Sequence, residues 1–101
     1  MTQSVLRFTF LPGRRGDFVE TFTRLQVLEA SSRQAGWRGG QLLIDVDDPD
    51  TAMVIAQWDS PAAYQGWLDN PVREEIGERL EPFLAEDPQG RVLELVHEVG
   101  A

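Results

Sequence analysis

The chain has 101 residues, a hydrophobic fraction of 42% and a formal net charge of −8. This length and composition predict one domain, residues 1–101, with a core of its own. The negative charge repels phosphate backbones and argues against nucleic acid as a partner. No apolar run is long enough to span a membrane, and the first residues lack the pattern of a signal peptide, so we expect a cytoplasmic protein without a membrane partner. The absence of cysteine excludes disulfides and cysteine metal sites.

The first predicted elements are a strand and a helix. Residues 4–11 alternate apolar and polar side chains, which is typical of a half-buried strand, and Pro12–Gly13 ends it. Asp17 is expected to open a helix, with Glu20 three residues later in an Asp version of the capping box. The apolar face of this helix is predicted to consist of Phe18, Phe22, Leu25 and Leu28.

Two further strands are predicted, over residues 41–46 and 51–58, with an acidic turn between them. The aspartates of this turn do not follow the spacing of a calcium loop, because Asp50 stands where that loop needs its glycine. Trp58 shares one strand face with three small residues, Ala52, Val54 and Ala56. Small residues beside a large aromatic leave room for a pocket. The alternative is that Trp58 only fills the core.

Two helices and a last strand complete the chain. Ser60–Pro61 predicts the start of a short helix that reaches residue 68, and Asn70–Pro71 breaks it and caps the next helix. The inner stripe of that next helix is predicted to be Val72, Ile76, Leu80 and Phe83. Its solvent face is predicted to hold Glu74, Glu75, Glu78, Arg79 and Glu81. A strand over residues 91–99 is expected to place His97 on one face with Leu93, Leu95 and Val99.

The predicted order is therefore β-α-β-β-α-β, with the second helical region broken in two. This order indicates an α+β, ferredoxin-like fold, in which a four-stranded antiparallel sheet carries its helices on one face. The other face is expected to expose Val5, Met53 and Ile55. Aliphatic side chains on an open face favour coverage by a second copy, so we expect a homodimer, with a monomer as the alternative.

Several motifs resemble the antibiotic biosynthesis monooxygenase family, and the resemblance covers nearly the whole chain. They are Ala56–Ser60 (AQWDS), Ala63–Tyr64, Pro12–Gly13 followed by Phe18, and Asn70–Arg73 (NPVR). The resemblance implies a dimeric α+β barrel built from ferredoxin-like subunits. It leaves the reaction open, because the family includes quinone-forming oxygenases without a cofactor, haem-degrading enzymes, polyketide cyclases and members with no known activity.

The resemblance favours the quinone-forming branch of the family. Haem-degrading relatives carry a histidine on the helix after the strand-end tryptophan, whereas this chain has Trp67 and Leu68 there. Trp58 and Tyr64 match the motif of the quinone-forming relatives. Those relatives also carry an asparagine four residues before the tryptophan, and this chain has Val54 at that position. The chain therefore departs from the pattern at one residue that bears on the oxygen chemistry.

The function we predict is oxidation of an aromatic polyketide or polyphenol, of anthrone or naphthol type, to a quinone. No cofactor and no metal is expected, with molecular oxygen as co-substrate and a hydrophobic aromatic small molecule as ligand. We expect Trp58 and Tyr64 to donate hydrogen bonds to a substrate oxygen, and His97, the only histidine, to act as the base. The residues expected to line the substrate site are Phe8, Phe22, Val54 and Trp67.

Three alternatives accompany these expectations. The three tryptophans fit packing roles equally well, and a lone histidine near a chain end is often a packed or interface residue. An aromatic polyketide cyclase would need the same flat pocket but no oxygen. A non-catalytic, ligand-binding or stress-related dimer would use the same residues as core.

Overall fold

The computed structural model describes residues 1–100, and Ala101, the last residue of the predicted domain, lies outside the described residues. The helices and strands follow the predicted β-α-β-β-α-β order. They are β1 (Thr2–Thr9), α1 (Arg15–Arg24), α2 (Val27–Ser31), β2 (Trp37–Ile44), β3 (Thr51–Trp58), α3 (Pro61–Leu68), α4 (Pro71–Leu80), the 3₁₀ turn η1 (Glu81–Phe83) and β4 (Gln89–Glu94).

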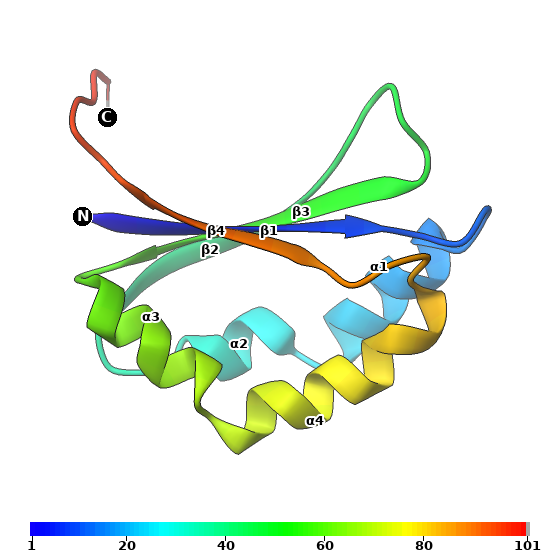
Figure 1. Cartoon of the computed structure of the whole chain (residues 1–101), viewed down its shortest axis with the longest axis horizontal. Helices are drawn as coiled ribbons and strands as arrows, with labels where there is room; N and C mark the ends of the chain where they lie inside the picture. Colours follow the sequence, from blue (N-terminus) through cyan, green and yellow to red (C-terminus); the bar gives the residue numbers. More distant parts are fainter. Residues whose placement is uncertain (101) are drawn as a thin grey trace.

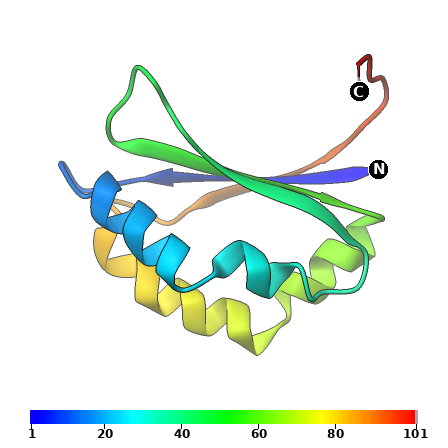
Figure 2. The same cartoon turned by 180° about the vertical axis from the view of Figure 1, so that it is seen from behind.

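The strands form one antiparallel sheet in the order β2-β3-β1-β4. The helices all lie on one side of this sheet, below it in Figure 1, and the other face carries no helix in either view (Figures 1 and 2). This is the ferredoxin-like arrangement that the sequence predicts, and it is confirmed. The two central strands, β1 and β3, supply most of the buried sheet residues against which the helices pack.

Local signals set both helix starts in the second half of the chain. The Ser60 hydroxyl accepts the N–H of Ala63 at 3.2 Å, and the Asn70 side chain accepts the N–H of Val72 at 3.0 Å. A proline occupies the first helical position in each case. Both predicted starts, and the break between α3 and α4, are confirmed.

The first helix differs from its prediction in start and continuity. It begins at Arg15 rather than Asp17, and the Asp17 carboxylate accepts a bond from Arg14 Nε at 2.8 Å instead of capping. It ends at Arg24, because Gln26 adopts a left-handed conformation with φ of 55°. Leu28 therefore belongs to a separate short helix, α2, but it packs against the same buried cluster around Phe18 and Phe22 as Leu25 does.

Several strand boundaries were also predicted wrongly. β1 spans Thr2–Thr9 rather than 4–11, β2 begins at Trp37 rather than 41, and β4 begins at Gln89 rather than 91. The ends of β2 and β4 have a local explanation. β2 ends at Ile44 because the Asp45 carboxylate accepts the N–H groups of Asp47 (2.8 Å) and Asp48 (3.0 Å), which closes the turn. These two bonds hold the pKa of Asp45 below its ordinary value. β4 ends at Glu94 instead of residue 99, because its partner β1 begins at Thr2 and offers only the Met1 carbonyl to Leu95 N–H beyond that point.

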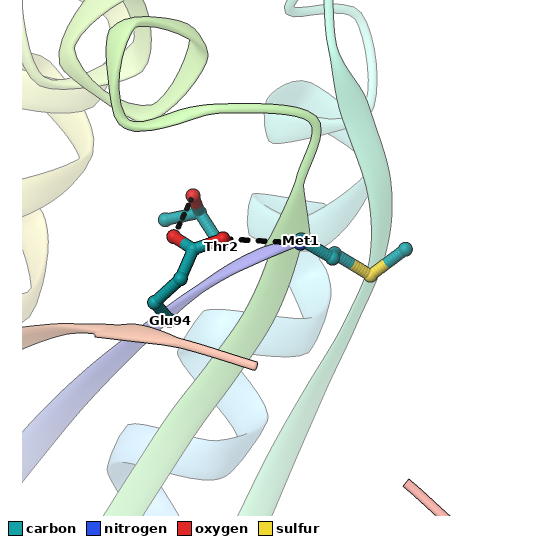
Figure 3. Close-up of polar contacts among 3 residues, drawn as sticks. All are labelled: Met1, Thr2 and Glu94. Atoms are coloured by element: carbon teal, nitrogen blue, oxygen red, sulfur yellow. Dashed lines mark hydrogen bonds and ion pairs between the residues drawn. The ribbon is translucent and has the colours of Figure 1, made fainter. Parts of the chain in front are cut away.

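Glu94 fastens the start of β1 to the end of β4 (Figure 3). One carboxylate oxygen lies 3.1 Å from the Met1 amino group, and the other accepts the Thr2 hydroxyl at 2.9 Å. The amino group, and after it the hydroxyl, lower the pKa of the Glu94 carboxyl. The two strands are thus joined by side chains where their backbone ladder ends.

The interior consists of two clusters of buried side chains. One, which we call the phenylalanine core, contains Phe8, Phe10, Phe18, Phe22, Ala52 and Leu80. The other, which we call the tryptophan core, contains Ala56, Trp58, Tyr64 and Trp67. Ile76 of α4 packs against both. The predicted inner stripe of α4 is corrected at one end, because Val72 is exposed.

Candidate functional site

A cavity of about 380 Å³ lies between the sheet and α4. This volume falls within the range of small-molecule sites. The cavity is lined by Leu6, Phe8, Phe22, Val27, Val54, Trp67, Arg73, Ile76, Gly77, Leu80, Glu81, Leu84, Asp87 and Pro88. Most of these side chains are apolar, and the charged ones come from α4, η1 and the segment before β4.

The cavity forms where the two cores meet. Phe8, Phe22 and Leu80 of the phenylalanine core line it, and so does Trp67 of the tryptophan core. The rings of Phe8 and Phe22 both pack on Phe18, with ring centroids 4.8 Å and 5.7 Å away. The aromatic wall is therefore held by buried neighbours, which suits a flat apolar ligand.

All four residues predicted to contact a substrate line this cavity. Phe8 and Val54 lie on the neighbouring strands β1 and β3, where Leu6 pairs with Val54 and Phe8 with Ala52. Phe22 comes from α1 and Trp67 from α3. The structure thus brings together residues that are up to 59 positions apart, from Phe8 to Trp67. Their contact with a substrate stays a prediction.

Trp58 lies on the predicted face of β3 but not on the cavity wall. Its side chain is buried, and its indole N–H donates to the Ser4 hydroxyl at 3.0 Å. It does not line the cavity. In this structure the donor is used inside the core, and the predicted role of this N–H toward a substrate oxygen stays untested.

Tyr64 packs behind the cavity wall. Its ring lies 5.5 Å from that of Trp58, between centroids, and it is buried in the tryptophan core. It is not among the residues that line the cavity, whereas Trp67 of the same cluster is. Trp58 and Tyr64 thus support the cavity through Trp67 and do not face it.

His97 also lies away from the cavity. β4 ends at Glu94, so His97 is not on a strand face with Leu93, and its side chain is exposed. The alternation that suggested an inward histidine continues in the sequence, but the pairing of β4 with β1 ends with Glu94 opposite Thr2. The predicted position of His97 is corrected accordingly.

Sequence reasoning missed three charged residues of the cavity: Arg73, Glu81 and Asp87. Glu81 was assigned to the solvent face of α4. A signal for Arg73 was present, because it shares the helical spacing of Ile76, Gly77 and Leu80, which all line the cavity. These three are the titratable side chains of the cavity wall.

Two kinds of feature are not found in the part of the chain that the structure describes. Within residues 1–100, no three His, Asp or Glu side chains are grouped so that they would hold a metal ion. None of the helices in that range is long and apolar enough to cross a bilayer.

The fold and the cavity define a small ferredoxin-like α+β protein with an aromatic-lined site between its sheet and its helices. The family model of the antibiotic biosynthesis monooxygenases matches residues 1–79. The chain belongs to this family, as its motifs suggested.

Solved structures share this fold over nearly the whole chain. SnoaB, a cofactor-independent oxygenase from Streptomyces nogalater, is 21% identical, with a TM-score of 0.81 over 99% of this chain and 97% of that one. A Deinococcus radiodurans protein that carries the family's name is 14% identical, with a TM-score of 0.84 over 100% and 98%. One from Bordetella bronchiseptica is 18% identical, with a TM-score of 0.83 over 95% and 97%. No curated protein matches the sequence. The TM-scores establish a shared fold.

Proposed function

We propose that the protein is a cofactor-independent monooxygenase that converts an electron-rich polycyclic phenol, of anthrone or naphthol type, to a quinone. The observation that carries this proposal is the cavity at the junction of the two cores, with Phe8, Phe22, Val54 and Trp67 on its wall. Membership of the monooxygenase family supports it, and so does the shared fold of SnoaB.

The chemistry needs no bound redox group, since the ionised substrate reduces oxygen itself. An anthrone-type CH₂ group loses a proton, and the resulting carbanion passes one electron to O₂. The substrate radical and superoxide combine into a peroxide anion, which takes up a proton. The hydroperoxide then loses water and leaves a carbonyl. In sum, the substrate loses two hydrogens and gains one oxygen, and the second oxygen atom leaves as water.

The protein has to exclude water, position the ring and accept a proton. The apolar wall serves the first two needs. For the third, Glu81 and Asp87 are the only carboxylates among the residues that line the cavity. We therefore assign the role of proton acceptor to these carboxylates in place of His97. In this proposal Trp58 and Tyr64 are positioning residues. They pack in the same buried cluster as Trp67, on the side away from the cavity, and hold its ring in place.

A cyclase remains the second candidate because of Val54. This side chain lines the cavity and offers no amide to hold a peroxide or carbonyl oxygen, unlike the asparagine of the quinone-forming relatives. A polyketide cyclase needs a shaped apolar cavity and an acid or base, but no group for oxygen. The two candidates are separated by whether O₂ is consumed.

We also propose that the protein is a homodimer joined through the open sheet face. The chain carries 17 Asp and Glu residues, yet no open-face position of the strands is acidic. These positions are Gln3, Val5, Arg7, Thr9, Gly39, Gln41, Leu43, Thr51, Met53, Ile55, Gln57, Gln89, Arg91 and Leu93. Two copies can therefore approach through this face without opposing carboxylates.

The dimer is tested by sedimentation velocity at micromolar concentration. Wild type is expected to sediment as a dimer, and Ile55→Lys, which places a charge at the centre of the open face, as a monomer. Val46→Lys is the matched control, because Val46 is 94% exposed in the turn after β2. A monomeric wild type would refute the dimer.

The oxygenase is tested by oxygen uptake with a panel of anthrones and naphthols, without flavin and with a metal chelator present. With ¹⁸O₂, one labelled atom is expected in the quinone and the other in water. Substrate consumption and a cyclised product without oxygen uptake would establish the cyclase instead.

A further inference from the structure

Arg73 differs from every other arginine of the chain. Arg14, Arg24 and Arg38 form ion pairs, and the guanidinium of Arg15 bonds two backbone carbonyls. The remaining five have no ion pair with the described residues, and four of these are exposed: Arg7, Arg33, Arg79 and Arg91. Among these five, Arg73 alone is partly buried, and it lines the cavity.

This position is costly for a cation. A partly buried charge loses part of its hydration, which nothing in the described chain repays with an ion pair. Arg73 also lies in the first turn of α4, near the positive end of that helix, where a cation is disfavoured. A guanidinium on a cavity wall without an ion pair has donors available for a ligand oxygen that carries negative charge.

We expect the ligand to enter the cavity in its neutral form and to become an anion there. Glu81 and Asp87 line the same cavity, and the chain as a whole carries a net charge of −8. The two carboxylates and the net negative charge repel a ligand that is already an anion. A neutral phenol enters against no such barrier. Once inside, it can pass its proton to a carboxylate of the cavity while its oxygen comes to face the guanidinium.

We propose that Arg73 holds the oxyanion that forms when a neutral phenol or enol ionises inside this cavity. The O–H bond breaks, the electron pair stays on the ligand oxygen, and the proton goes to Glu81 or Asp87 and then to solvent. The inference rests on the proposed function for its substrate class. It adds that Arg73 stabilises the ionised state more than the bound neutral one, which is the requirement for catalysis and not merely for affinity.

The test uses a ligand that reports its own ionisation and is not turned over. 2-Hydroxyanthraquinone is flat, and its phenol and phenolate absorb at different wavelengths. Its absorption is titrated with pH in the presence of saturating protein. In the wild type, the pKa of the bound phenol is expected to be lower by about one unit or more than that of the free compound, since a cation nearby shifts an acid by ~1–3 units.

Two variants on the same helix give the comparison. Arg73→Gln is expected to abolish the downward shift, and Arg79→Gln, whose side chain is exposed and away from the cavity, is expected to keep it. Arg73→Gln should unfold at the same temperature as the wild type or higher, because no ion pair is lost. A lower unfolding temperature would assign Arg73 a structural contact and overturn the proposal.

The outcomes separate this inference from the proposed function. A bound phenol whose pKa is the same in wild type and Arg73→Gln would overturn the role of Arg73, and oxygen uptake by either protein would leave the oxygenase standing. A shift that depends on Arg73 without any oxygen uptake would uphold the role of Arg73 and refute the oxygenase. A wild type that binds no hydroxyanthraquinone would overturn the role of Arg73, and oxygen uptake alone would then decide on the oxygenase.

Discussion

Trp58 on β3 donates its indole N–H to the hydroxyl of Ser4 on the neighbouring strand β1, across 3.0 Å. Ser4 pairs with Ala56 in the ladder, so this bond joins the side chains of the two central strands on the helix-facing side. Both residues are buried. Trp58 therefore fixes the sheet under α3, and Trp67 is the member of its cluster that reaches the cavity.

Loss of the Trp58 donor is expected to lower stability. Trp58→Phe leaves the buried Ser4 hydroxyl without its partner, which costs about 1–3 kcal/mol in the free energy of unfolding. Urea unfolding of Trp58→Phe, Ser4→Ala and the double variant measures this. The double variant should be less destabilised than the sum of the two, because the unpaired hydroxyl is gone. Additive losses would show that the bond contributes nothing.

The helix break at Gln26 predicts a stabilising substitution. Gln26 has φ of 55°, a region that costs a residue with a side chain roughly 1–2 kcal/mol. Glycine adopts this φ freely, and part of the gain is offset by its larger entropy in the unfolded chain. Gln26→Gly is thus expected to raise the free energy of unfolding by about 0.5–1 kcal/mol. Gln65→Gly, in the middle of α3, is the control.

The control substitution should act in the opposite direction. Glycine inside a regular helix costs about 1 kcal/mol relative to good helix formers. Both variants are compared with wild type by urea unfolding. Equal destabilisation by the two would contradict the strain assigned to Gln26.

Much of the fold follows from signals that are local in sequence. Ser60–Pro61 and Asn70–Pro71 each hold their own helix start, so neighbouring residues alone predicted them correctly. The end of β4 did not follow from its own alternating pattern. It depends on where β1 begins, more than ninety positions away, as the Glu94–Met1 contact shows.

The site was predictable to a similar extent. Face patterns brought Phe8, Phe22, Val54 and Trp67 to one cavity, because alternation and helical spacing determine which way a side chain points. The use of the Trp58 donor could not be foreseen, since Ser4 is 54 positions away.

The charged residues of the site were hidden for a different reason. The charged residues of α4 were predicted to form its solvent-exposed face. Arg73, however, lies on the same side of the helix as Ile76 and Leu80, both of which line the cavity. In a sequence, a cation next to an apolar helix stripe fits two positions: the solvent-exposed border of the helix or the wall of a cavity. Only the space between the helix and the sheet distinguishes them, and that space is known only from the structure.

Acid is expected to destabilise the protein through Glu94. The pKa of this carboxyl is lower in the folded chain than its ordinary value of 4.5, so the unfolded state binds more protons in the range below that value. Its contribution is therefore present above pH 4.5 and disappears as the pH falls through the folded pKa. Urea midpoints of wild type and Glu94→Gln across this range measure the effect.

The difference in urea midpoint between wild type and Glu94→Gln should depend on pH. The wild type and Glu94→Gln should differ most at neutral pH and converge in acid. Asp45, whose pKa is lowered by two backbone N–H groups, adds a similar slope that both proteins share. A difference between the two proteins that does not change with pH would contradict the assignment to Glu94.

The carboxylates of the cavity are expected to carry the proton transfer. Neutral amides at both positions, Glu81→Gln with Asp87→Asn, should lower kcat by about 10²-fold or more, in line with the usual contribution of a general base. Binding of 2-hydroxyanthraquinone at a pH where it is neutral should persist. His97→Gln is the control and should leave kcat unchanged. A large loss in His97→Gln alone would return the role of base to the histidine.

The central claim is that oxygen chemistry takes place in the cavity beneath α4, and Gly77 gives the most direct test. A Cβ atom at Gly77 would meet no atom within 4 Å beyond its own helix backbone and chain neighbours, and the residue lines the cavity. Gly77→Leu should therefore fill the site while it strengthens the helix by about 1 kcal/mol. Gly16→Leu in α1 meets equally open space outside the cavity and serves as the control.

The measurement is oxygen uptake with the best anthrone or naphthol, for wild type, Gly77→Leu and Gly16→Leu. We predict that Gly77→Leu loses uptake while its unfolding temperature is unchanged or higher, and that Gly16→Leu keeps the wild-type rate. Full uptake by a stably folded Gly77→Leu would contradict the claim and place the chemistry elsewhere on the protein.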